Sequence, residues 1–127
     1  MAVPRVPITS LQVHEPHDDL DLRTAQALRR AADAFGGNVV ALMLSVDKSR
    51  VSRWRRSGVP TSARPRVLDL DHLLDRLLLE MPADLVGTWM TGPNAHLNFA
   101  RPVDVLVLRG AAPVLEALDA YAAGAFA

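Results

Sequence analysis

Apolar residues recur at helical intervals near the start of the chain. Between residues 18 and 36, five of them stand three or four apart, which predicts a helix with one apolar stripe. Asp18 or Asp19 can cap the first turn by accepting hydrogen bonds from its free N–H groups. Gly36 and Gly37 end the helix, because glycine adopts the left-handed conformation without steric cost. The stripe consists of Leu22, Ala25, Leu28, Ala32 and Phe35.

Two short helical segments follow, at residues 38–46 and 49–58, with a polar turn between them. Two short helices and a tight turn are typical of a helix-turn-helix motif. Ala41 stands where close packing of the first helix admits only a small side chain, and Ser45 stands where repressor-type motifs usually have glycine. We therefore expect Ser45 to adopt the turn conformation with some strain. The residues predicted to be buried between the helices are Val40, Leu44, Val46, Val51 and Trp54.

A longer helical pattern covers residues 63–81. Its apolar face is wider than a single surface stripe requires, so we expect it to pack on two sides, once in its own domain and once against another element or subunit. His72 lies among charged residues and is expected to be exposed. The apolar face consists of Val67, Leu70, Leu73, Leu74, Leu77, Leu78 and Met81.

The closing stretch, from Trp89 onward, alternates turn signals with helical ones. Gly92-Pro93-Asn94 is a turn in which proline fixes φ and asparagine can bond its own backbone. Leu97 and Phe99 are expected to anchor the segment after it. Pro102 suits the first turn of a helix that stops at Gly110, and a last helix covers residues 112–123. The inward residues of that last helix are Val114, Leu115 and Leu118. The patterns together predict an all-α fold.

The first seventeen residues are interpreted differently. Pro4, Pro7 and Pro16 and a scarcity of large apolar groups indicate an extended or partly disordered arm over residues 1–17. A helix-turn-helix module is then expected at 18–62 and a helical domain for binding and dimerisation at 63–127. Pro16 separates His14 from His17, which argues against a metal pair on a helix, and no metal or cofactor site is predicted.

The charges are segregated along the chain although the formal net charge is zero. Residues 48–66 carry seven basic groups and no acidic group, whereas residues 1–47 and 67–127 are net negative. A short basic segment in a neutral protein indicates a local site for an anion. The outward residues of the second helix are Lys48, Ser49, Ser52, Arg53 and Arg56, which can contact DNA bases and phosphates. Arg55, Arg64 and Arg66 are expected to contact backbone phosphates.

Composition narrows the functional classes. The chain has 127 residues and no cysteine, which excludes disulfides and thiol catalysis and fits a reducing cytoplasm. The N-terminus lacks the pattern of a signal peptide, and no apolar run is long enough to span a membrane. His72, His96 and the scattered aspartates show no spacing that brings a nucleophile and a base together. We therefore expect a protein that is not an enzyme.

The residues of the closing stretch resemble the toxin-binding C-terminal domain of the Xre/MbcA/ParS family of type II antitoxins. The resemblance covers residues 65–127, and the preceding helix-turn-helix fits the usual N-terminal half of the family. Ala100-Arg101 departs from the glycine that the family commonly has before the helix-opening proline. The matching pattern consists of Trp89, Pro93-Asn94, Leu97, Pro102, Leu106, Gly110, Val114, Leu118 and Gly124-Ala125-Phe126.

The resemblance implies an antitoxin that neutralises a RES-domain toxin, an enzyme that degrades NAD⁺, and that represses its own operon through the helix-turn-helix. It also implies that the C-terminal region covers the toxin's active-site cleft, with residues 118–127 as the blocking element. Operator DNA and the toxin are the expected partners, and a homodimer or a larger complex with toxin is the expected assembly. The expected toxin-binding residues are Trp89, Asn94, Leu118, Tyr121, Gly124, Phe126 and Ala127.

Other interpretations stay open from the residues alone. Tyr121 and Phe126 can instead fold back onto the core of their own domain. The chain can also be a transcription regulator whose C-terminal half only dimerises or senses a ligand, with no toxin partner. A RES-domain reading frame beside the gene distinguishes the antitoxin from that regulator.

Overall fold

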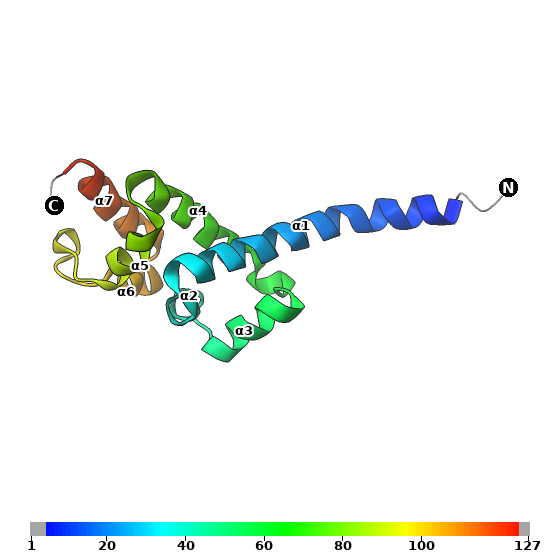
Figure 1. Ribbon diagram of the computed structural model, residues 1–127, viewed down its shortest axis with the longest axis horizontal. Helices are drawn as coiled ribbons and strands as arrows, with labels where there is room; N and C mark the ends of the chain where they lie inside the picture. The colour runs from blue at the N-terminus through cyan, green and yellow to red at the C-terminus, as the bar shows by residue number, and fades with distance from the viewer. Residues whose placement is uncertain (1–4, 125–127) are drawn as a thin grey trace.

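The computed structural model describes residues 5–124, and the side chains of residues 19–124. These residues form helices joined by short turns, with no strand among them, so the predicted all-α fold is confirmed (Figure 1). The α-helices are α1 (Arg5–Phe35), α2 (Gly37–Leu44), α3 (Lys48–Ser57), α4 (Arg64–Glu80), α5 (Ala83–Thr91), α6 (Pro102–Arg109) and α7 (Ala111–Ala122). Two 3-10 turns, Thr61–Ala63 and Ala95–Leu97, precede α4 and α6.

Helix α1 begins much earlier than the sequence predicts. It starts at Arg5 and runs for 31 residues, projecting from the helical body toward the N-terminus (Figure 1). The prediction of an extended arm is therefore wrong for residues 5–17, while residues 1–4 lie outside the described part. Pro7 stands in the first turn, where a missing N–H removes no intrahelical hydrogen bond, and Pro16 removes one bond from a long helix.

The buried stripe of α1 is also rotated from its predicted position. Leu28, Ala32 and Phe35 are buried as predicted, but Leu22 is 58% exposed. Thr24 is buried in the stripe and donates a hydrogen bond from its hydroxyl to the Leu20 carbonyl at 2.8 Å. A buried hydroxyl satisfied within its own helix needs no further partner, so a polar residue occupies a position that the apolar pattern alone misses.

One hydrophobic core joins the two halves of the chain. Helix α1 packs along α4 and also contacts α2, α3 and α5, while α2 contacts α6. Helix α4 thus packs on several elements, as its wide apolar face predicts, although Leu78 stays 38% exposed. The largest fully buried side chains come from both halves and include Leu28, Val40, Leu44, Val67, Leu74, Leu77, Val86, Met90, Val103, Val114 and Leu118.

The helix-turn-helix forms with the predicted buried residues. Val40, Leu44, Val51 and Trp54 are buried and Val46 packs against them. Ala41 is 6% exposed, which fits the requirement for a small side chain there.

Ser45 has φ 57° and ψ 43°, so serine does adopt the left-handed turn conformation in place of the usual glycine. For a residue with a Cβ atom this conformation costs about 1–2 kcal/mol.

No helix within residues 5–124 has both the length and the apolarity that crossing a membrane requires.

Candidate functional site

Helix α3 begins with a well-formed cap. The Asp47 carboxylate accepts hydrogen bonds from the backbone N–H of Arg50 at 2.8 Å and from the Ser49 hydroxyl at 2.7 Å. The hydrogen bond from Ser49, together with that from Arg50, lowers the pKa of Asp47 below its ordinary value. Ser49, predicted to contact DNA, thus uses its hydroxyl hydrogen within the cap and keeps only its oxygen lone pairs for another partner.

The predicted DNA-contacting residues share the outer surface of α3. Val51 and Trp54 face the core, at 2% and 8% exposure, so Trp54 is a core residue and no base-stacking group. The remaining side chains of the helix point to solvent, and each of the predicted contacts is exposed: Lys48, Ser49, Ser52, Arg53, Arg55 and Arg56.

Two arginines expected to contact phosphates also have internal partners. Arg64 forms an ion pair with Asp21 of α1, and its side chain is only 13% exposed. Arg66 donates a hydrogen bond from Nη1 to the Leu44 carbonyl at 2.9 Å, which satisfies an oxygen at the end of α2. Both partners come from elements more than 20 residues away in the sequence, and Arg66 stays exposed, so contact of these two arginines with phosphates stays a prediction.

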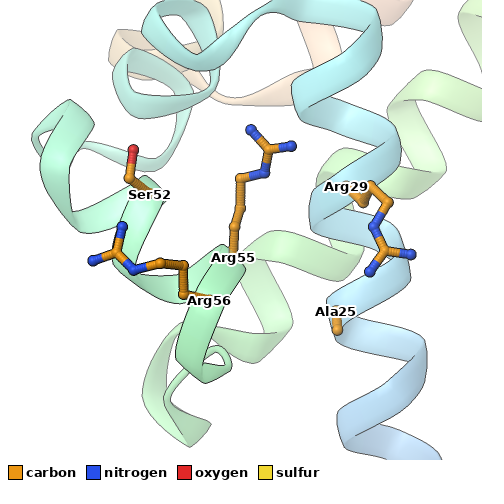
Figure 2. A pocket seen from close by; sticks show the side chains of 5 residues that line it. All are labelled: Ala25, Arg29, Ser52, Arg55 and Arg56. Atoms are coloured by element: carbon orange, nitrogen blue, oxygen red, sulfur yellow. The ribbon is translucent and has the colours of Figure 1, made fainter.

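A cleft lies between α3 and α1. Its volume is about 390 Å³, and Figure 2 shows Arg55 extending from α3 into the space between the two helices. The lining consists of Ala25 and Arg29 from α1 and Ser52, Arg55 and Arg56 from α3 (Figure 2). Sequence reasoning missed Arg29, which stands 23 residues before Ser52 and outside the basic segment.

A second concave surface lies on the C-terminal half. It is a groove of about 420 Å³ between α5, the 94–100 loop and α7, and it is lined by Thr88, Trp89, Gly92, Pro93, Asn94, Ala95, His96, Phe99, Ala117 and Tyr121. Trp89 and Tyr121 are half-buried and meet edge to face, with ring centroids 6.4 Å apart and planes at 70°. This arrangement is favourable for aromatic pairs. The structure thus brings together three predicted toxin-binding residues, Trp89, Asn94 and Tyr121.

Asn94 holds the loop beside this groove in one shape. Its side chain accepts a hydrogen bond from the backbone N–H of His96 at 2.9 Å. Its backbone carbonyl accepts from the N–H groups of Leu97 at 2.9 Å and Phe99 at 2.8 Å, and its own N–H donates to the Ala100 carbonyl at 3.1 Å. Asn94 therefore organises the loop as well as lining the groove.

Phe99 differs from its predicted role as an internal anchor. Its side chain is 71% exposed, and its backbone has φ 67°, next to Asn98 with φ 56°. Asparagine adopts this conformation readily, but it is costly for phenylalanine, and Phe99 keeps it here because the loop hydrogen bonds fix its backbone. Leu97 alone packs against the core as predicted.

The remaining predicted toxin-binding residues differ in their exposure and location. Leu118 is fully buried in the core, so it supports α7 from beneath and cannot contact a partner directly; that prediction is corrected. Gly124 is exposed, with φ 74°, and its left-handed conformation follows the end of α7. Phe126 and Ala127 lie outside the described residues.

Comparison with known proteins identifies relatives. No family model matches the chain. The chain is 31% identical over 78 residues to the mycobacterial cidal antitoxin MbcA of Mycobacterium bovis and of two Mycobacterium tuberculosis strains, covering 60% of this chain and 69% of the relatives. A chain in the crystal structure of the M. tuberculosis MbcT–MbcA toxin–antitoxin complex superimposes with a TM-score of 0.65 at 26% identity, covering 81% of this chain and 96% of that one.

The sequence match and the structural match name the same antitoxin, and the structural match extends over most of both chains. Identity above 30% over more than two thirds of the relative is accompanied by a structural match with a TM-score of 0.65. The chain therefore belongs to the MbcA family of antitoxins.

Proposed function

We propose that this protein neutralises a RES-domain toxin that degrades NAD⁺, within a type II toxin–antitoxin system. The observation that carries the proposal is the likeness over 81% of the chain to a protein crystallised in a toxin–antitoxin complex. The groove between α5 and α7 forms the surface that covers the toxin's active-site cleft, together with the residues that follow α7. The protein acts by binding the toxin and thereby keeping NAD⁺ out of the toxin's active site.

The chemistry of this groove supports a protein partner. Large aromatic side chains bury much area at low entropic cost, and they dominate the binding energy of many protein interfaces. Trp89 and Tyr121 are already held against each other, and Phe99 is presented by a loop with a fixed backbone. A partner that buries Phe99 therefore meets a surface already in shape, which reduces the entropy lost on binding.

A truncation tests the blocking role of the tail. Because Tyr121 packs against Trp89, a cut before Tyr121 removes packing as well as the tail. Deletion of residues 125–127 leaves α7 and Gly124 intact and is the sharper variant. We expect co-purification with the toxin to persist while NAD⁺ hydrolysis returns, measured with purified complexes. Full protection of NAD⁺ by the truncated chain would show that the last three residues are not the block.

We further propose that α3 binds operator DNA, so that the protein represses its own operon. Five exposed cations on this helix support the proposal: Lys48, Arg50, Arg53, Arg55 and Arg56. If Arg53 contacts a guanine edge, Arg53→Ala should cost about 1–3 kcal/mol on the operator and much less on unrelated DNA. Gel-shift titrations of both duplexes measure this. An equal loss on both duplexes would instead assign Arg53 to a phosphate.

A further inference from the structure

The cleft between α1 and α3 combines three arginines without an acidic residue. Arg29 comes from α1 and Arg55 and Arg56 from α3, with Ser52 as the remaining polar group of the lining. None of the three arginines forms an ion pair with a residue of the described part of the chain. Figure 2 shows their guanidinium groups apart from one another around the cleft, and an anion between them neutralises the positive charge that the three residues bring to it.

Other clefts along α1 show the contrast, and the first of them adjoins the cleft at Arg29 through Ala25. One of them combines Arg53 and Arg64 with Asp21, and another combines Arg23 and Arg30 with Asp71. Arg30 pairs with Asp71 and with Asp75 at 2.8 Å, although it is the residue next to Arg29. The chain thus supplies acidic partners to arginines around the same helix and leaves the cleft at Arg29 positive.

Asp33 is the nearest acidic residue along α1 on the C-terminal side of Arg29, one helical turn away. It lines a different cleft, together with Arg30, Leu74 and Asp84. Lys48 lies on the α3 side, at the start of that helix, and adds another positive charge. The electrostatic surroundings of the cleft are therefore dominated by cations from both helices.

We propose that this cleft is a phosphate-binding site and that Arg29, although outside the helix-turn-helix, grips a DNA backbone phosphate there with Arg55. The proposal rests on the proposed binding of DNA by α3. Ser52 and Arg56 belong both to the cleft and to the outer face of α3, so a duplex on that face brings its backbone to the cleft. About 390 Å³ accommodates a phosphate group with several waters, and guanidinium groups bind phosphate oxygens with paired N–H donors.

The test is the salt dependence of DNA binding by the full chain. Each phosphate contact contributes about 0.9 to the slope of log affinity against log salt. Arg29→Ala should lower that slope by about 1 and weaken binding to the operator and to an unrelated duplex by the same factor. Arg23→Ala is the matched control, since Arg23 is exposed on the same helix beside Asp71, and it should change neither quantity.

A double-mutant cycle locates the shared phosphate. If Arg29 and Arg55 hold the same group, the combined loss in Arg29→Ala/Arg55→Ala is smaller than the product of the two single losses. A steep slope in the wild type that Arg29→Ala leaves unchanged would overturn the site while leaving DNA binding by α3 intact. A wild type whose DNA binding is insensitive to salt would overturn the DNA-binding proposal itself.

A competition separates the two sources of phosphate. DNA binding is measured at constant ionic strength while inorganic phosphate replaces chloride. Weaker DNA binding by the wild type in phosphate, absent in Arg29→Ala, supports a backbone phosphate as the occupant, because the free ion and the duplex then compete for one place. Binding of inorganic phosphate to the DNA-bound wild type, abolished by Arg29→Ala and without release of DNA, would assign the cleft to a free phosphate ion and overturn its assignment to the duplex.

Discussion

The two candidate surfaces of this protein are built by opposite means. The outer face of α3 carries exposed cations on a regular helix, and Asp47, the acidic residue just before it, is engaged as the cap. The groove between α5 and α7 carries aromatic rings, and its loop is fixed by hydrogen bonds around Asn94 with two left-handed residues. We therefore expect the first surface to act through charge over a distance and the second through shape on contact.

The largest expected difference between the two surfaces is the salt dependence of their binding affinities. Lys48, Arg50, Arg53, Arg55 and Arg56 are exposed on α3, and Arg29 lies nearby on α1. If about six phosphates are neutralised, DNA affinity should fall about 10³-fold between about 50 and 200 mM salt. Toxin affinity should change only a few-fold, because aromatic burial is not screened. Fluorescence anisotropy with DNA and with toxin measures both; parallel losses would show that charge drives the two interactions alike.

Substitution of Phe99 by glycine should move stability and binding in opposite directions. Glycine adopts φ 67° freely, so the free energy of unfolding should rise by about 1 kcal/mol. Loss of an exposed aromatic anchor should weaken toxin binding by at least about 2 kcal/mol, roughly 30-fold. Thermal unfolding and calorimetric titration with the toxin measure the two effects.

Asn98→Gly is the matched control for this substitution. It relieves the neighbouring left-handed residue, with φ 56°, and retains the aromatic side chain. We expect higher stability with unchanged toxin affinity. If Phe99→Gly binds the toxin as tightly as Asn98→Gly does, the exposed ring is no part of the interface.

Ser45→Gly tests the backbone strain in the turn before α3. Ser45 adopts the left-handed conformation at the end of α2, and glycine there should stabilise the fold by about 1 kcal/mol. Because Ser45 lies in the turn and not on the outer face of α3, DNA affinity should stay the same. Denaturant unfolding and anisotropy provide the two measurements. A loss of DNA affinity in this variant would mean that the strained turn sets the position of α3.

The Asp47 cap should make a small, pH-dependent contribution. Its pKa is lowered in the folded protein by the hydrogen bonds from Ser49 and Arg50. The stabilisation is therefore present above the unfolded pKa, about 3.8, and is lost as the pH falls through the lower folded pKa. Melting temperatures measured from pH 6 down to pH 2 should fall more in the wild type than in Asp47→Asn, which keeps a capping oxygen without a titrating group. Identical pH profiles for the two proteins would show that Asp47 does not contribute to the loss of stability in acid.

Much of this architecture could be predicted from local sequence. The helix-turn-helix could be predicted from Val40, Ala41, Val51 and Trp54. These residues lie within twenty positions of one another, and their spacing decides which faces of α2 and α3 pack together. The start of α1 could not be predicted in the same way, since rules for proline at an isolated position overstate its effect in a long helix.

The site residues show where local reasoning ends. Arg64 and Arg66 look like their exposed neighbours in the sequence, but Asp21 and the Leu44 carbonyl bind them in the fold. Phe99 reads as a buried anchor by its type, whereas the turn around Asn94 directs it outward. Arg29 meets α3 only through tertiary packing, so its place in the cleft has no signal in a linear pattern.

The most direct test of the account is NAD⁺ hydrolysis by the cognate RES-domain toxin in the presence of this protein. Equimolar wild-type chain should stop hydrolysis, and Arg53→Ala, altered only on α3, should stop it equally well. Phe99→Gly should require a concentration about 30-fold higher for the same inhibition. Continued NAD⁺ hydrolysis with saturating wild-type protein would contradict the proposal that this chain is the toxin's inhibitor.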